Sequence, residues 1–140
     1  MKKHLNVLYQ SDNNYAALTG IAMTSLFMNN KDIKFNIYIL NNKISEENIS
    51  KFKELCEKFG NEISFVDTSK IIDKIKSLDL TPYGGNYSTY LRIFAIGYLN
   101  IIGDYILSID GDTIITSSIS ELCDLNMDKY LCAGVCDSTQ

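Results

Sequence analysis

The sequence predicts an α/β fold in which helices cover both faces of a mostly parallel β-sheet. Short apolar runs, rich in β-branched and aromatic residues, alternate with longer segments whose apolar residues recur at helical spacing. The resulting order of strand, helix, strand, helix, strand, helix, helix and strand is typical of sheets built from βαβ units. Because 140 residues is the usual length of one domain, we expect residues 1–140 to form a single domain.

The amino-terminal half supplies two strands and two helices. Strands are expected over residues 5–9 and 35–40, where apolar residues run between polar segments. Apolar residues at helical spacing predict a helix over 15–29. The residues that recur are Leu18, Ile21, Ala22, Ser25, Leu26 and Met28. A second helix is expected between Ser45, a favourable N-cap, and Gly60, a residue that commonly ends helices.

The carboxyl-terminal half continues the alternation of strands and helices. A third strand is expected over residues 63–66 and a short helix over about 69–77. A further helix begins at Ser88 or Thr89 and runs to about Leu99. Apolar runs then predict strands over 105–109 and 131–135.

The composition argues against several classes of protein and site. A net charge of −4 and a pI near 4.9 leave no basic surface for nucleic acid, so no nucleic-acid partner is expected. Four cysteines without a Cys-x-x-Cys pair, and a single solvated histidine, His4, argue against a zinc site and indicate reduced thiols. No stretch resembles a secretion signal or a membrane span, so we expect a cytoplasmic protein with at most peripheral membrane association.

The most informative segment is the apolar run that ends on Asp110, Gly111 and Asp112. The run reads as a buried strand, which places both acids at the carboxyl end of the sheet, where open α/β sheets bind their ligands. Two ionised carboxylates this close repel one another unless a divalent cation lies between them. Oxygen ligands suit Mg²⁺ or Mn²⁺, and these ions recruit phosphate oxygens, so a phosphorylated ligand is expected.

A structural interpretation of the same segment stays open at this point. Asp-Gly-Asp can form a turn in which glycine supplies a positive φ, and strand-like residues do resume at 113–115. The polar loop expected over residues 10–14 favours a ligand site. It follows the first strand and should therefore reach the same edge of the sheet as the two acids. Taken alone, Asp12, Asn13 and Asn14 would be expected only to cap the next helix. Together with the acid pair they favour a nucleotide pocket.

Four segments resemble, in the correct order, the blocks of the family 8 glycosyltransferases. They cover residues 7–16, 44–48, 88–93 and 105–112. The resemblance implies a GT-A fold and a retaining, metal-dependent enzyme that transfers a hexose from a UDP-sugar. It further implies a bacterial origin and a saccharide or lipopolysaccharide-type acceptor.

On the nucleoside side, the resemblance assigns Asp12 and Asn14 to the positions that contact base and ribose. Tyr15 begins the helix beside the uracil, and Ser11 belongs to the same donor-binding loop.

On the diphosphate side, the resemblance assigns Asp110 and Asp112 to the metal pair, with Mn²⁺ or Mg²⁺ as cofactor, and places Gly111 between them in the donor site. Arg92 matches an arginine that faces the donor sugar and the acids, where a guanidinium adds bidentate contacts. The structural alternative for Arg92 is an ordinary ion pair on a helix surface. No catalytic residue is assigned, and Arg92 has a supporting role.

The family usually continues well beyond the length of this sequence and takes a further metal ligand, typically a histidine, from its later half. The sequence therefore looks like an amino-terminal donor-binding part, with weak metal binding, uncertain turnover and an apolar edge that could self-associate.

Two other functions remain open. One is a nucleotide-binding or interaction module without turnover. The other is a phosphohydrolase of the haloacid dehalogenase type, whose motif requires Thr or Val where Ile114 stands.

Overall fold

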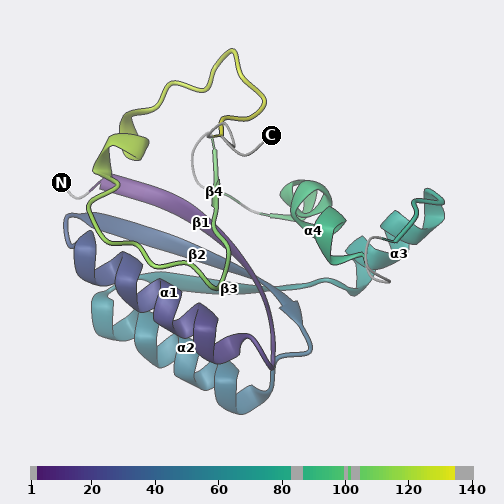
Figure 1. Ribbon diagram of the computed structural model, residues 1–140, viewed down its shortest axis with the longest axis horizontal. Coiled ribbons are helices and arrows are strands. Elements are labelled where there is room, and N and C mark those ends of the chain that lie inside the picture. Colours follow the sequence, from purple (N-terminus) through teal and green to yellow (C-terminus); the bar gives the residue numbers. More distant parts are fainter. Residues whose placement is uncertain (1–2, 83–86, 100, 102–104, 135–140) are drawn as a thin grey trace.

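A computed structural model of the chain describes residues 3–82, 87–99, 101 and 105–134. Within these residues the strands form one parallel sheet in the order β3-β2-β1-β4 (Figure 1). The strands are β1 (Lys3–Asp12), β2 (Ile33–Asn42), β3 (Glu62–Asp67) and β4 (Leu107–Ser108). The prediction of a parallel sheet is confirmed.

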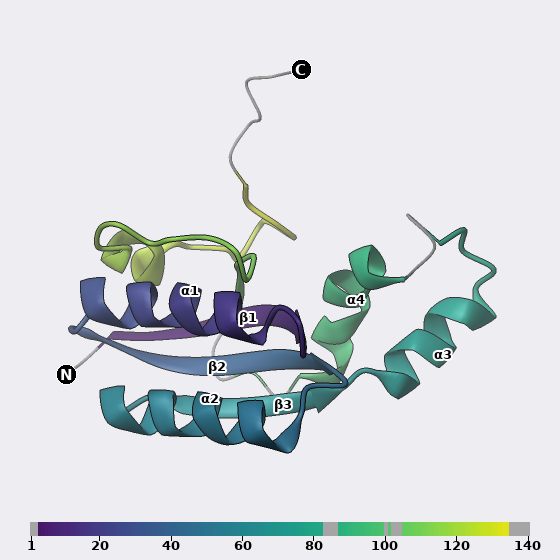
Figure 2. The ribbon, with the colours of Figure 1, turned by 60° about the horizontal axis from the view of Figure 1, so that its bottom comes forward.

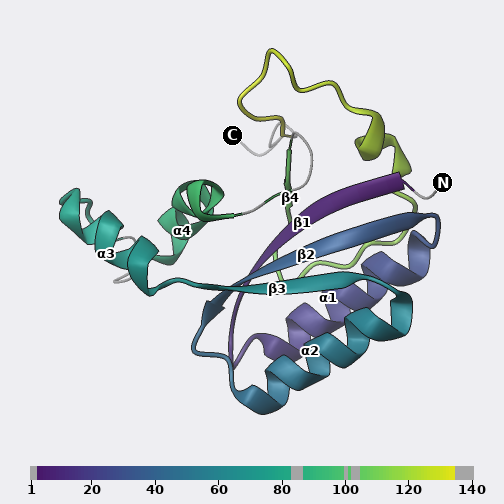
Figure 3. The same ribbon diagram turned by 180° about the vertical axis from the view of Figure 1, so that it is seen from behind.

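The helices lie in two pairs. They are α1 (Ala16–Asn29), α2 (Glu46–Phe59), α3 (Ser69–Ser77) and α4 (Ser88–Ala95), with 3₁₀ turns at Ile96–Tyr98 and Ser120–Asp124. Figure 2 shows α1 and α2 running alongside the strands. Seen from behind in Figure 3, α3 and α4 lie together near the carboxyl ends of β2 and β3. The four helices lie in the parts of the chain where the alternation of elements predicts them.

Alternate residues of the strands build a separate apolar core on each face of the sheet. Leu5, Val7 and Tyr9 of β1 pack with buried residues of α1 and α2. Leu8 of β1 and Leu40 of β2 point to the other face. There they pack with residues of α3 and α4, namely Ile71, Ile75, Leu91 and Ala95. Helices therefore cover both faces, as the sequence predicts.

The ends of α2 agree with the sequence. The hydroxyl of Ser45 accepts a hydrogen bond from the backbone N–H of Asn48 at 3.3 Å, which makes Ser45 the N-cap. Gly60 follows the last helical residue in the left-handed conformation, with φ of 71°. Local signals of this kind fix the boundaries of the helix.

The first strand is longer than predicted. Residues 10–12, expected in a loop, pair with residues 40–42 of β2 and complete β1. The partner strand overrides the local polarity here, because residues 10–12 extend the parallel backbone ladder with β2. The helix predicted to reach Leu99 ends at Ala95 and tightens into the 3₁₀ turn Ile96–Tyr98.

The predicted strands of the carboxyl-terminal part are wrong in extent or absent. Only Leu107 and Ser108 of the run 105–109 are strand, paired with Val7 and Leu8. Residues 113–115 form no strand, because α1 partners their backbone: Ile115 N–H donates to the hydroxyl of Ser25 at 2.9 Å, and its carbonyl accepts from Asn29 at 2.9 Å. Residues 131–134 form no strand either, and 135 lies outside the described residues.

Helix α1 is apolar on all sides, so helical spacing alone did not identify its buried face. Leu18, Ile21 and Met28 are 45 %, 54 % and 59 % exposed. The buried residues are Ala16, Thr19, Ala22, Met23, Leu26 and Phe27. Thr19, a polar residue in the first turn of the helix, is among the fully buried ones.

The thiols agree with the sequence where the structure describes them. Cys56, Cys123 and Cys132 are free, and Cys136 lies outside the described residues. Burial raises the pKa of the Cys56 thiol to about 12.

His4 is exposed, as expected. In the described part of the chain, no helix combines the length and apolar character needed to cross a membrane.

Tyr9 provides a test of the core. Its side chain is fully buried, and its hydroxyl has no hydrogen-bond partner among the described residues. An unpaired buried hydroxyl costs about 1–3 kcal/mol. We therefore expect Tyr9→Phe to leave the free energy of unfolding unchanged or to raise it by about 1 kcal/mol, as measured by urea denaturation. A loss above about 1 kcal/mol would show that the hydroxyl has a partner.

Candidate functional site

The Asp-Gly-Asp segment, hereafter the acid turn (residues 110–112), lies against the end of β1 and the first turns of α1. The backbone N–H of Ile109, just before it, donates to the carbonyl of Leu8 at 3.0 Å. A Cβ added at Gly111 would lie 2.5 Å from Oγ1 of Thr19 and 3.7 Å from the carbonyl oxygen of Gln10. The two polar segments predicted to share one edge of the sheet are therefore in contact at this point.

Gly111 is required by space and not by its backbone conformation. Among the described glycines only Gly60 has a positive φ, so the expectation that the turn uses glycine for a left-handed conformation is wrong. Thr19 occupies the volume that any side chain at position 111 would need. The close approach of turn and helix therefore excludes every residue except glycine, unless Thr19 moves or changes.

The two carboxylates of the acid turn are both exposed. The backbone carbonyl of Asp110 accepts from the N–H and the hydroxyl of Thr113, at 3.3 and 2.8 Å, and these bonds close the turn. The prediction that Asp-Gly-Asp forms a turn is therefore confirmed. The bonds that close the turn use the backbone carbonyl of Asp110 and not the carboxylate of either acid.

Arg92 of α4 reaches across to the acid turn. Its guanidinium donates to Oδ1 of Asp110 and forms an ion pair with it, as the expected grouping of these residues requires. The two side chains are 41 % and 54 % exposed, so the pair adds little to stability. The contact joins α4 to the acid turn and places a cation beside the carboxylates.

The loop after β1 is held by its own polar side chains. Oδ1 of Asp12 accepts from the backbone N–H groups of Asn14 and Tyr15, both at 2.9 Å, and so closes a turn just before α1. The N-cap of α1 is Tyr15, which makes no side-chain cap bond, so the expectation that Asp12 caps the helix is wrong. Oδ1 of Asn13 accepts from the N–H of Ser45 and the amide of Asn48, at 3.0 and 2.9 Å. Asn13 thereby ties the loop to the start of α2.

The remaining residues of the loop differ in exposure. The side chains of Asn14 and Tyr15 are exposed and accessible to a ligand. Ser11 is buried: its hydroxyl accepts from Oγ1 of Thr19 and donates to the carbonyl of Asp12, both at 3.1 Å. Ser11, predicted to bind the donor, supports the loop from inside with its side chain.

Gln10 is a candidate that sequence reasoning missed. Its Oε1 is buried and has no hydrogen-bond partner among the described residues. It precedes Ser11 on β1, and its side chain points to the opposite face of the sheet. Its position directly after the apolar residues of the first strand could have identified it. We assigned Gln10 instead to the loop that follows.

The acid turn provides part of a metal site. Within the ranges that the structure describes, no group of three or more His, Cys, Asp or Glu residues is placed to hold an ion. Two carboxylates in one turn nevertheless fit Mg²⁺ or Mn²⁺, which bind through one or two carboxylates and fill their other positions with water and phosphate. The donor set therefore fits a hard cation that arrives with a phosphorylated ligand.

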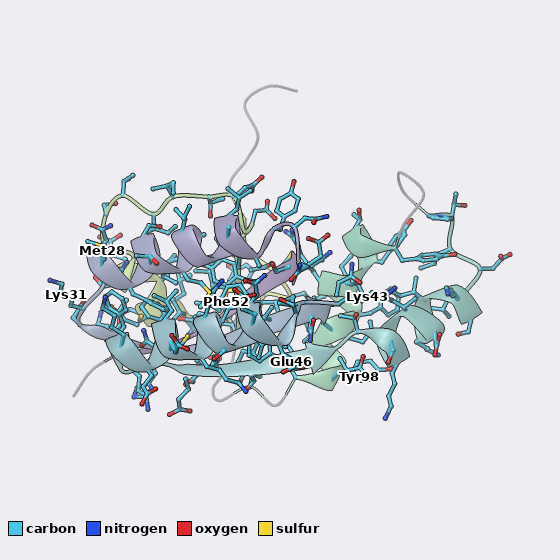
Figure 4. The ribbon with its side chains drawn as sticks, turned by 90° about the horizontal axis from the view of Figure 1, so that it is seen from below. Met28, Lys31, Lys43, Glu46, Phe52 and Tyr98 are labelled. Carbon is cyan, nitrogen blue, oxygen red and sulfur yellow. The ribbon has the colours of Figure 1, made fainter. Side chains whose placement is uncertain are left out.

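Two hollows lie away from the acid turn. One, of about 240 Å³, is lined by Phe27 and Lys31 at the amino end of the sheet. The other, of about 320 Å³, lies between α1 and α2 and is lined by Phe52, which Figure 4 labels between these helices. Neither hollow includes the acid turn or Arg92, and the side chains of Asp110 and Asp112 are exposed outside both.

Comparison with known proteins agrees with this arrangement. The model of glycosyl transferase family 8 matches residues 6–140. The chain belongs to glycosyltransferase family 8. This family membership confirms the resemblance found in the sequence and removes the phosphohydrolase alternative.

Relatives of the chain are longer. A lipopolysaccharide 1,2-glucosyltransferase of Escherichia coli (strain K12) is 29 % identical over 133 residues, which are 95 % of this chain and 38 % of that protein. A lipopolysaccharide 1,3-galactosyltransferase of Salmonella typhimurium (strain LT2) is 26 % identical over 132 residues, which are 93 % and 38 %. This family 8 chain thus spans 38 % of the length of both relatives.

A solved structure shows the same fold. The galactosyltransferase LgtC, in complex with donor and acceptor sugar analogs, superposes with a TM-score of 0.71 at 24 % identity, over 88 % of this chain and 43 % of that one. This likeness and the parallel sheet confirm the predicted GT-A fold.

The contact between Gly111 and Thr19 can be tested by paired substitutions. Gly111→Ala should lower the free energy of unfolding by about 1–3 kcal/mol, because the new methyl group overlaps Oγ1 of Thr19. In the double variant with Thr19→Ala much of the added loss should disappear, since Cβ of Thr19 lies at an ordinary 3.5 Å. Urea denaturation measures both values.

Thr19→Val is the matched control, because it keeps the volume of threonine and removes only the hydroxyl. Gly111→Ala should cost as much in the Thr19→Val background as in the wild-type chain. Equal costs of Gly111→Ala in all three backgrounds would show that Thr19 does not exclude side chains at position 111.

Proposed function

We propose that this chain is the donor-binding part of a metal-dependent, retaining hexosyltransferase that uses a UDP-hexose. The observation that carries the proposal is the acid turn, packed against the end of β1 with Arg92 on Asp110. Family 8 membership and relatives named as glucosyl- and galactosyltransferases support it. The acceptor we propose is a saccharide of the lipopolysaccharide type.

Each part of the site has a distinct task in this proposal. Asp110 and Asp112 would hold Mn²⁺ or Mg²⁺ together with the diphosphate, and the ion would supply Lewis-acid stabilisation of the departing nucleoside diphosphate. Arg92 would bind phosphate oxygens with its planar fork of donors. The charge that grows on the leaving group is thereby neutralised within the site.

The nucleoside would lie over the loop after β1. Asp12 uses Oδ1 to accept from the amides of Asn14 and Tyr15, which leaves Oδ2 for base or ribose. The exposed side chains of Asn14 and Tyr15 lie beside it on the same loop. Ser11 would support this loop without a side-chain contact to the ligand. The bonds from Asn13 to the start of α2 hold the loop in place before the ligand binds.

The chain spans 38 % of the length of both relatives, and we assign no catalytic residue to it. A single domain over residues 1–140 and a cytoplasmic location both remain predictions.

An interaction module is the second candidate function, favoured by the exposed Leu18, Ile21 and Met28 of α1. A monodisperse monomer in light scattering would argue against self-association through this face.

The proposed function is tested by isothermal titration of UDP with and without Mn²⁺. We expect binding that depends on Mn²⁺, and we expect Asp110→Asn and Asp112→Asn each to weaken it at least about tenfold, because the ion loses a charged ligand. Asp128→Asn is the matched control, because it removes the same charge from an exposed position outside the site and should bind normally. Unchanged binding in both acid-turn variants would refute the metal role.

A further inference from the structure

We propose that Arg92 opposes cation binding at Asp110 until a nucleoside diphosphate is present, so that cation and nucleotide bind with positive coupling. The inference rests on the proposed function and adds an order of events to it. In the free chain Arg92 occupies Oδ1 of Asp110, one of the oxygens that a cation would use.

The use of arginine at this contact supports a role beyond a surface ion pair. The chain has 13 Lys and Arg residues, of which Arg92 is the one arginine. The three other ion pairs between described residues all use lysine, namely Lys3, Lys34 and Lys51. Arginine differs from lysine in its rigid fork, which matches phosphate and carboxylate alike. The contact therefore has the chemistry to exchange one anion for another.

Charge sets the direction of the effect. The guanidinium lies against Asp110 and would face a divalent cation bound to the same carboxylate. Charges of +1 and +2 about 5 Å apart in a water-like dielectric repel by an amount that corresponds to roughly tenfold in affinity. Arg92 should therefore weaken cation binding by the free chain.

A diphosphate reverses this effect. Its oxygens offer Arg92 a second anionic partner, so the guanidinium can leave Asp110 and bind the ligand. The exposure of both side chains, 41 % and 54 %, leaves room for this exchange without a change in the core. By linkage, the nucleotide must raise the affinity for the cation by the same factor as the cation raises the affinity for the nucleotide.

The experiment measures the dissociation constant of Mn²⁺ from the electron paramagnetic resonance signal of the free ion, with and without UDP, and a protein-free titration corrects for the Mn²⁺ that UDP itself chelates. In the wild-type chain, UDP should strengthen Mn²⁺ binding at least about tenfold. Arg92→Gln should bind Mn²⁺ about tenfold more tightly than wild type without UDP, because the positive charge is gone. The gain on adding UDP should be smaller in this variant.

Two further variants separate charge from structure. Arg92→Lys keeps the positive charge and should bind Mn²⁺ within about threefold of wild type in the absence of UDP. Lys34→Gln removes the same charge from the ion pair with Glu62, on neighbouring strands away from the acid turn, and should leave both constants unchanged. Matching thermal unfolding curves confirm that each variant folds.

The outcomes distinguish the inference from the function on which it rests. If wild type binds UDP with Mn²⁺ but Arg92→Gln binds Mn²⁺ alone no more tightly than wild type, the inference is overturned and the proposed function stands. If wild type binds neither Mn²⁺ nor UDP, both are overturned. Tighter Mn²⁺ binding by Lys34→Gln as well would reduce the effect to net charge and overturn the role of Arg92.

Discussion

The candidate site depends on the close approach of Gly111 to Thr19. Strand β4 has only two paired residues, Leu107 and Ser108, so its hydrogen bonds to β1 provide little anchorage for the turn that follows. The position of both acids is therefore set by packing against α1 as much as by the sheet. That packing is possible because position 111 has no side chain, and because the hydroxyl of Thr19 is turned to Ser11.

The chain is anchored again immediately after the acid turn. Ser25 and Asn29 of α1, and Asn30 just after it, hydrogen-bond the backbone of Ile115 and Ile119 at 2.7–2.9 Å. These helix side chains take the place of a neighbouring strand and satisfy backbone groups that would otherwise need one. The acid turn is thus held before and after by elements that do not themselves belong to the site. Such support on both sides limits how far the carboxylates can move.

The parts of the fold that the sequence predicted correctly are those with local causes. The N-cap at Ser45, the end at Gly60 and the helix over 69–77 depend on residues near in sequence. The errors lie where a distant partner decides: β2 extends β1 through Asp12, and α1 prevents 113–115 from being a strand. In the site, the types and grouping of residues were readable from the motifs. The steric reason for Gly111 was not, because Thr19 is distant in sequence and its contact exists only in the folded chain.

The structural interpretations of the site residues describe the free chain and do not exclude binding. Asp12 closes the turn before α1, the acid turn is a turn, and Arg92 does form a surface ion pair. Each of these roles uses only part of the group's capacity, since a carboxylate has two oxygens and a guanidinium five donors. The contacts of Asp12 and of the acid turn's backbone hold these side chains near the positions that a nucleotide and a cation would require, whereas in our proposal Arg92 exchanges Asp110 for the diphosphate. A site organised in this way loses less conformational freedom when it binds its ligand.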